Sequence, residues 1–108
     1  MAFVIKLLGA GPTNAGSLTV PYSVSSPATA AIVNNLRFVN TSTAAGTINL
    51  FFNPSGAVGQ VRILEKDKPI AAGDILVVKQ ELTMVVGDAI EVTTSVAMEY
   101  VVCGMQKE

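Results

Sequence analysis

Six acidic residues in the second half of the chain are the side chains best suited to chemistry. Paired carboxylates serve as acid and base in glycosidases, and clustered carboxylates bind Ca²⁺. No two of the six stand in an Asp-x-Asp arrangement, and no segment matches an EF-hand calcium loop. We therefore interpret them as solvated residues of turns and strand edges. They are Asp67, Asp74, Glu81, Asp88, Glu91 and Glu99.

The chain of 108 residues contains no His and a single Cys, Cys103. Without His, the usual Ser-His-Asp and Cys-His catalytic arrangements are excluded. His-ligated zinc sites are excluded as well, and one Cys can form neither a Cys-only site nor an intrachain disulfide. The sequence thus predicts a protein that is not an enzyme, with no catalytic, metal-binding or cofactor-binding residue.

The segment Gly9–Gly16 invites comparison with a phosphate-binding loop. Its spacing is Gly-x-Gly-x-x-x-x-Gly, and neither Gly-Lys-Ser/Thr nor a helix follows it. Glycine, proline and asparagine are residues of turns and loops. We therefore predict a flexible loop from Gly9 to Ser17.

Charge and hydropathy exclude two classes of partner. The chain has 7 Lys+Arg against 8 Asp+Glu, a net charge of -1, and so few dispersed cations predict no nucleic-acid binding. The longest aliphatic runs, 30–33 and 75–78, are far shorter than the roughly 20 residues of a membrane span. Lys6 lies inside the apolar N-terminal stretch instead of ahead of it, so we expect no signal peptide.

Apolar and polar residues alternate along most of the chain, with turn residues between the runs. This pattern predicts a single all-β domain over residues 1–108, an antiparallel β-sandwich or jelly-roll of about eight strands. Residues 1–17 form an N-terminal strand and a Gly-rich loop that are free to reach a neighbouring subunit. The expected strands are 3–8, 18–24, 29–40, 47–53, 61–65, 75–79, 82–86, 89–94 and 96–103, with a charged turn at 66–69.

Several strands carry more local predictions. Pro21 donates no hydrogen bond, so strand 18–24 should lie at a sheet edge, with its alternate residues from Leu18 to Val24 on one face. Strand 29–40 should bulge near Asn34-Asn35 and form a hairpin with strand 47–53. Gly73-Asp74 and Gly87-Asp88 should form two equivalent turns, with Gly at positive φ and Asp capping the backbone.

The chain has more apolar side chains than one small domain can bury. Half of its residues are apolar and only 14% are charged, against about 25% in a typical soluble domain. We therefore expect self-association. Alternation points Phe51 and Asn49 outward from strand 47–53 and Val39 outward from the strand before it, and Phe3 belongs to the N-terminal strand. These four residues are our predicted contacts with other chains, unless the protein's own loops cover them.

Four segments carry a resemblance to a known family. They are Leu18–Pro21, Ala30–Phe52, Ala71–Asp74 and Val86–Val92. In this arrangement the chain resembles small β-sandwich virion proteins of tailed bacteriophages. The resemblance implies a capsid decoration (cement) protein that stabilises the shell, commonly as a homotrimer on the major capsid protein lattice. It also implies synthesis in the host cytoplasm and location in the virion, with a neck, tail or fibre component as the alternative.

A carbohydrate-binding β-sandwich is a further alternative. Such modules usually present an aromatic platform to the sugar. The chain has no Trp, so only Tyr22 and Tyr100 remain to form one, and they would have to be exposed and adjacent.

Overall fold

Strands make up most of the protein. The computed structural model describes residues 3–25, 28–54, 60–79 and 81–107, and these residues form ten strands and no helix, which confirms the all-β prediction. Nothing within these ranges therefore has the form of a long apolar helix able to cross a membrane. The strands are β1 (Phe3–Pro12), β2 (Leu18–Ser23), β3 (Ala30–Asn40), β4 (Gly46–Asn53), β5 (Val61–Arg62), β6 (Lys68–Ile70), β7 (Ile75–Val78), β8 (Leu82–Val85), β9 (Ala89–Thr94) and β10 (Met98–Lys107).

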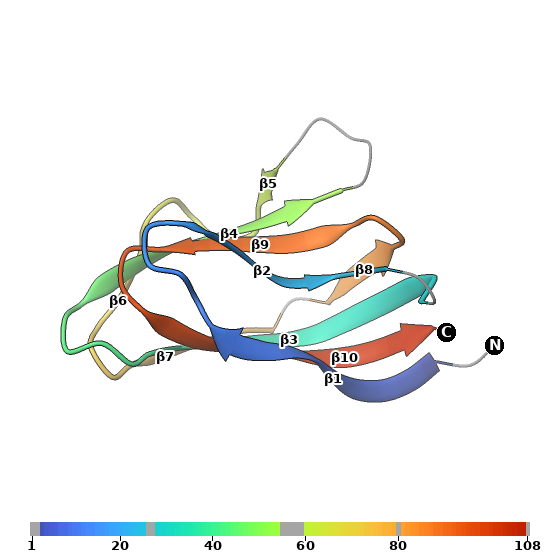
Figure 1. The fold of residues 1–108 in the computed structure, drawn as a ribbon, viewed down its shortest axis with the longest axis horizontal. Helices are drawn as coiled ribbons and strands as arrows, with labels where there is room; N and C mark the ends of the chain where they lie inside the picture. Colours follow the sequence, from blue (N-terminus) through green and yellow to red (C-terminus); the bar gives the residue numbers. More distant parts are fainter. Residues whose placement is uncertain (1–2, 26–27, 55–59, 80, 108) are drawn as a thin grey trace.

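The strands form two antiparallel sheets that lie one above the other in Figure 1. Sheet A has the order β1-β10-β3-β7, and β8 pairs with a different part of β3 from β7. Sheet B has the order β2-β9-β4-β5, and β6 pairs with a different part of β4 from β5. Because β7 and β8 share one side of β3, and β5 and β6 one side of β4, each pair occupies the place of a single strand.

Counted in this way, the pairing is that of one long hairpin rolled up on itself. The first strand pairs with the last (β1 with β10), the second with the last but one (β2 with β9), and so on inward to β4 with β5 and β6. This is the topology of a jelly roll, so of the two predicted architectures the sandwich takes the jelly-roll form. Short strands explain the count of ten: the predicted strand 61–65 ends at Arg62, and β6 begins inside the predicted charged turn.

The core lies between the two sheets and is filled by alternate residues of both. Leu36 and Phe38 of sheet A and Ile48 and Leu50 of sheet B are completely buried, as the alternation predicted. Removing one such side chain from water stabilises the fold by about 1.5–3 kcal/mol. The inward residues therefore determine how the two sheets pack.

Strand β2 lies at the edge of sheet B, as Pro21 predicted. Its pairing with β9 shifts register between Thr19 and Tyr22, on either side of Pro21. The shift breaks the alternation, so Pro21 and Tyr22 are both buried while Leu18 and Val20 are exposed. The prediction that Leu18 and Val20 share the face of Tyr22 and Val24 is therefore wrong.

Strand β3 runs without interruption from Ala30 to Asn40 and bulges where predicted. Asn35 pairs with Cys103 and Val33 with Gly104, which leaves Asn34 as the extra residue. On the other side of β3, β7 pairs with residues 36–39 and β8 with residues 30–33. The break between β7 and β8 thus lies opposite the bulge.

The predicted hairpin between 29–40 and 47–53 is wrong, because β3 belongs to sheet A and β4 to sheet B. Both strands bury one face, and they meet across the core instead of side by side. Asn40 stabilises the corner between them. Its buried amide donates to the carbonyl oxygens of Ala44 (3.0 Å) and Ile70 (3.1 Å) and accepts from the Ser42 backbone N–H (3.0 Å).

The two Gly-Asp turns are equivalent, as predicted. Gly73 and Gly87 have φ of 75° and 95°. The first turn exchanges backbone hydrogen bonds with Asn40 (Asn40 N to Asp74 O and Gly73 N to Asn40 O), and the second does the same with Val24. The Asp88 carboxylate also accepts from the Val85 N–H at 3.0 Å. Each turn therefore fastens the chain where it leaves one sheet for the other.

Strand β1 continues through the first half of the predicted loop. Gly9–Pro12 pair with residues 99–102 of β10, so a flexible loop over Gly9–Ser17 is wrong for these four residues. A Cβ atom at Gly9 would collide with the carbonyl oxygen of Pro21 in β2. Glycine is needed here because β1 of sheet A passes close to β2 of sheet B. In the sequence, a glycine with this role looks the same as a glycine of a loop.

Candidate interaction surface

The acidic residues lie apart from one another. Asp88 is buried and caps its own turn, Asp67 bonds to Asn49, and Glu91 is buried and bonds to Asn53 and Gln60. Among residues 3–25, 28–54, 60–79 and 81–107, no group of three Cys, Asp or Glu side chains is placed to bind a metal ion. The described acidic residues therefore share no common site.

The outer face of sheet B carries two hydrogen-bonded clusters, and we call it the polar face. In the first cluster the side-chain oxygen of Asn49 accepts from Arg62 Nη1 (2.8 Å) and from the Asp67 N–H (2.9 Å). The Asn49 amide nitrogen donates to the Asp67 carboxylate at 3.0 Å. This contact holds Asp67 in a left-handed conformation, with φ of 54°.

Phe51 lies in the middle of the polar face and is half-buried. The Arg62 guanidinium sits over its ring, 4.9 Å from the ring centre, in a cation–π contact. On the neighbouring strand β9, Glu91 pairs in register with Phe51. Its carboxylate accepts hydrogen bonds from the side chains of Asn53 (3.1 Å) and Gln60. The polar groups of these two clusters therefore find partners within the chain.

The outer face of sheet A is built differently. Because Leu36 and Phe38 point into the core, Arg37 and Val39 point outward, and the register carries the same side across all strands of the sheet. We call this surface the apolar face. Its residues are Ile5, Leu7, Ala10, Pro12, Ile32, Val39, Ile75, Val77, Val85, Val101, Cys103 and Met105, with Asn35, Thr83, Arg37, Glu99 and Lys107 among them.

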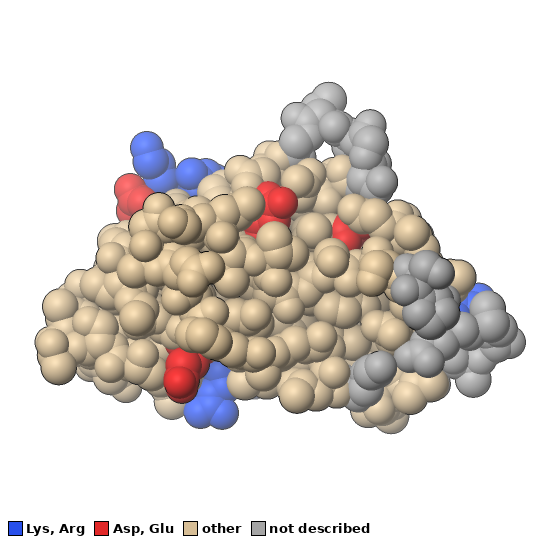
Figure 2. Space-filling model, viewed as in Figure 1, with Lys and Arg blue, Asp and Glu red and all other residues tan. Residues whose placement is uncertain are grey.

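Large aliphatic side chains on the apolar face are open to solvent. Ile5 is 84% exposed, Leu7 58%, Ile75 50% and Val77 43%. Figure 2 looks at the edge of the sandwich and not onto the apolar face, and charged side chains are sparse on the edge that it presents. Exposed aliphatic side chains gathered on one face of a sheet favour contact with another molecule.

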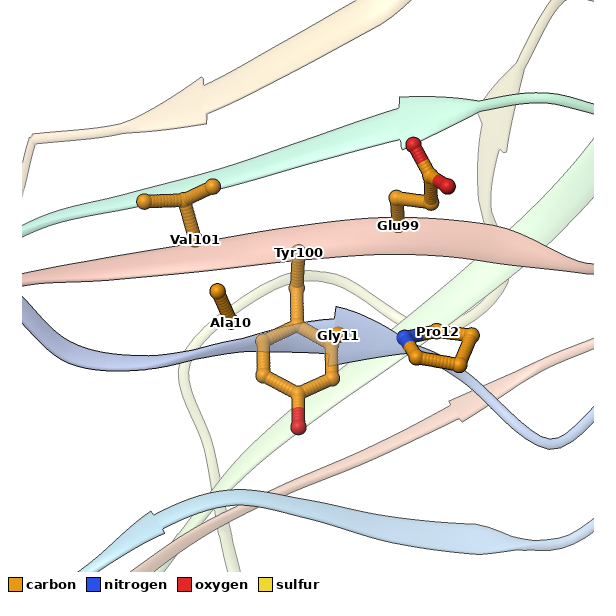
Figure 3. A pocket seen from close by; sticks show the side chains of 6 residues that line it. All are labelled: Ala10, Gly11, Pro12, Glu99, Tyr100 and Val101. Atoms are coloured by element: carbon orange, nitrogen blue, oxygen red, sulfur yellow. The ribbon is translucent and has the colours of Figure 1, made fainter.

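A shallow hollow lies at one end of the apolar face, between β1 and β10. Its volume is about 240 Å³, and Ala10, Gly11, Pro12, Glu99, Tyr100 and Val101 line it. In Figure 3 Glu99 and Val101 point to one side of β10, and the ring of Tyr100 points the other way, across Gly11. The outward residues form the walls of the hollow, and the small residues Ala10 and Gly11 leave it open.

The four predicted contact residues do not form one surface. Asn49 and Phe51 lie on the polar face, while Val39 lies half-buried on the apolar face between Glu99 and Ile75. The backbone of Phe3 pairs with Lys107 at the end of β1, and its side chain lies outside the described residues. Val39 thus marks the apolar face, and Asn49 and Phe51 belong to a surface bonded within the chain.

Sequence reasoning missed most of the apolar face. The missed residues come chiefly from β1 and β7, which read Phe-Val-Ile-Lys-Leu-Leu and Ile-Leu-Val-Val. A strand with one face in water alternates, whereas these two are apolar on both sides. That lack of alternation is the signal that could have identified Ile5, Leu7, Ile75 and Val77.

The two tyrosines do not form an exposed platform. Tyr22 is buried and its hydroxyl donates to the side chain of Gln106 at 2.8 Å. Tyr100 is half-buried on the inner side of β10, where it pairs with Phe38. This geometry gives no support to the carbohydrate-binding alternative.

Comparison with known proteins leaves the surfaces as the main guide to function. The chain matches no protein-family model and shows no significant similarity to any curated protein.

Proposed function

We propose that the protein is a non-enzymatic structural component of a virus particle, a capsid decoration protein that binds the major capsid protein lattice and stabilises the shell. The observation that carries the proposal is the apolar face. A surface with Ile5, Leu7, Ile75 and Val77 open to water gains free energy when another protein covers it.

The resemblance to phage virion proteins is the reason for proposing a virus particle, and the fold is compatible with that proposal. Jelly rolls occur in viral capsid domains, although they also occur in lectins and cupins, so this support is an analogy. The equivalent turns at Gly73-Asp74 and Gly87-Asp88 are part of the sequence pattern on which the resemblance rests, and here they fasten the corners of the jelly roll.

A symmetric shell suits a protein with a modest contact surface. Each copy needs only a limited area of contact when many copies bind one lattice together. The polar face carries charged and amide side chains, which are compatible with solvent. We therefore infer that the apolar face is covered by protein in the particle.

The test is made on particles purified from the culture that produces the chain. Antibodies raised against the recombinant protein should detect it in particles after density-gradient purification, at a fixed ratio to the major capsid protein. A cryo-EM map should show the jelly roll on the outside of the shell. Absence from the particles would overturn the proposal, and density at the neck, tail or fibres would replace the decoration role by that alternative.

A further inference from the structure

We propose that the apolar face binds a second copy of the chain, face to face, about a two-fold axis parallel to the strands and midway between β10 and β3. This inference rests on the proposed function and names the protein that covers the apolar face, so the dimer would contact the capsid lattice through the surfaces that stay open. It replaces the homotrimer that the resemblance implied. Three features of the face support it: the position of the hollow, the positions of the charges and the area.

The register defines which residues meet. Such an axis lays β10 of one copy over β3 of the other, and β1 over β7 and β8. Residues that share a level along the strands stay level, because the axis is parallel to them. One level contains Pro12, Glu99, Val39 and Ile75, and the next contains Ala10, Val101, Arg37 and Val77.

The first feature is a fit between protrusions and a hollow. At these two levels the axis places Ile75 and Val77 of one copy opposite Pro12 and Ala10 of the other. Ile75 and Val77 are 50% and 43% exposed, and Ala10 and Pro12 line the hollow of about 240 Å³. The same contact occurs twice, once on each side of the axis, as an isologous interface requires.

The second feature is the placement of charge. Arg37 of one copy lies opposite Val101 of the other, one level away from Glu99 on the same strand. Two residues along a strand span about 6.6 Å, so the long Arg37 side chain can reach that carboxylate. Two Arg37–Glu99 pairs therefore form across the axis, so both of these charged residues in each copy meet an opposite charge in the contact.

The third feature is area. The strands that form the face are up to ten residues long, as in β1 and β10. Four strands of this length cover a rectangle of roughly 33 by 19 Å, or about 600 Å² per copy. Two such faces bury about 1,200 Å², which reaches the lower limit of stable specific interfaces.

Cys103 provides a probe that needs no engineering. It is exposed on β10 at the centre of the apolar face and is the only Cys of the chain. Across the proposed axis two Cys103 Cα atoms lie roughly 11 Å apart, given sheets about 10 Å apart and strands about 4.8 Å apart. This separation is too great for a disulfide but is within reach of a short bis-maleimide.

The first experiment measures mass and cross-linking of the purified full chain. We expect a dimer by light scattering over a dilution series, cross-linked by bis-maleimide in the wild type and not in Cys103→Ser. Val77→Asp should make the chain monomeric and raise the rate of Cys103 labelling at least tenfold. The matched control is Val20→Asp, since Val20 in β2 is exposed to a similar extent (45%) and lies off the apolar face.

The second experiment tests the charge pairs between copies. Arg37→Glu places only acidic residues at the two positions, and Glu99→Arg places only basic residues there. Each variant alone should dimerise at least tenfold more weakly than the wild type. An equimolar mixture should form a heterodimer of wild-type affinity, which association unrelated to this geometry would not produce.

Each result bears on the pairing separately from the proposed function. A wild-type monomer, a trimer, or single charge variants that dimerise as the wild type does would each overturn the pairing. Detection of the chain on purified particles would stand in all three cases. Conversely, a dimer with the predicted cross-link supports the pairing even if the particles lack the protein.

Discussion

The two outer faces of the jelly roll differ in whether their side chains have partners within the chain. On the polar face, Asn49 and Glu91 each bond to two neighbours, and Arg62 covers Phe51. On the apolar face, aliphatic side chains such as Ile5 and Ile75 remain open to solvent. Both sheets have the same architecture and share one core. The inward residues thus specify the fold, whereas the outward residues specify what each face does.

This difference gives a rule for the effect of mutations. On the polar face a substitution leaves hydrogen-bonding groups of the same chain without partners, so it lowers the stability of the isolated protein. On the apolar face a substitution changes side chains that are already in water, so it should change association instead.

The largest effect on the isolated protein is expected for Glu91→Ala. Glu91 is buried, and its loss removes the acceptor of both the Asn53 and Gln60 amides. The free energy of unfolding should fall by about 2 kcal/mol, measured by urea denaturation, with no change in oligomeric mass. Glu81→Ala, at an exposed position, should change it by less than about 0.5 kcal/mol. Equal effects of the two variants would contradict the importance of this cluster.

Phe51→Ala should have the next largest effect. It removes a half-buried ring and the cation–π contact with Arg62, and we expect a loss of about 1.5 kcal/mol in unfolding free energy. Phe51→Leu keeps part of the apolar area and should lose less. If instead Phe51→Ala leaves stability unchanged and weakens association, Phe51 is an intermolecular contact, as the sequence predicted.

Asn49→Ala should cost about 1 kcal/mol, because its three hydrogen bonds hold Arg62 and the turn at Asp67 on a partly exposed surface. Hydrogen exchange at the Asp67 amide should become faster. Asn49→Asp keeps the acceptor for Arg62 and the Asp67 N–H but sets a second carboxylate against that of Asp67, so it should destabilise the protein at least as much as Asn49→Ala. Unaltered exchange in the alanine variant would mean that the turn holds its own conformation.

Ile75→Thr should have the smallest effect on the isolated chain and a clear one on assembly. The side chain is half exposed, so the unfolding free energy of the monomer should change by less than about 0.5 kcal/mol, while the dimer weakens. Val61→Thr is the control, since Val61 is 54% exposed in β5 of the other sheet. If Ile75→Thr destabilises the monomer as strongly as Glu91→Ala, the division between the faces is wrong.

Alternation along single strands was the reliable part of the sequence-based prediction. It identified the inward residues Leu36, Phe38, Ile48 and Leu50, and turn chemistry identified Gly73-Asp74 and Gly87-Asp88. These features are local, since each depends on a few consecutive residues. The choice of strand partner is not local. Alternation with a period of two shows which side of a strand is apolar, but it does not show which strand lies beside it.

The errors follow from the same distinction. The hairpin of 29–40 with 47–53 was wrong because both strands have apolar faces that can meet either within a sheet or across the core. Gly9–Pro12 was assigned to a loop because the close approach of Pro21 cannot be read from the sequence. On the surface, Phe51 faces away from the core as predicted, but the residue that covers it comes from the two-residue strand β5.

The place of β10 in sheet A has a consequence for synthesis on the ribosome. It is the last of the ten described strands along the chain, yet it lies between β1 and β3. Until it emerges, β1 has no neighbour in its sheet and one side of β3 is open, so half of the sandwich must wait for the final segment. Such distant pairing slows folding and leaves apolar surface and unpaired strand edges of the nascent chain open to aggregation. Cells that make this protein in quantity should therefore depend on chaperones that hold the growing chain.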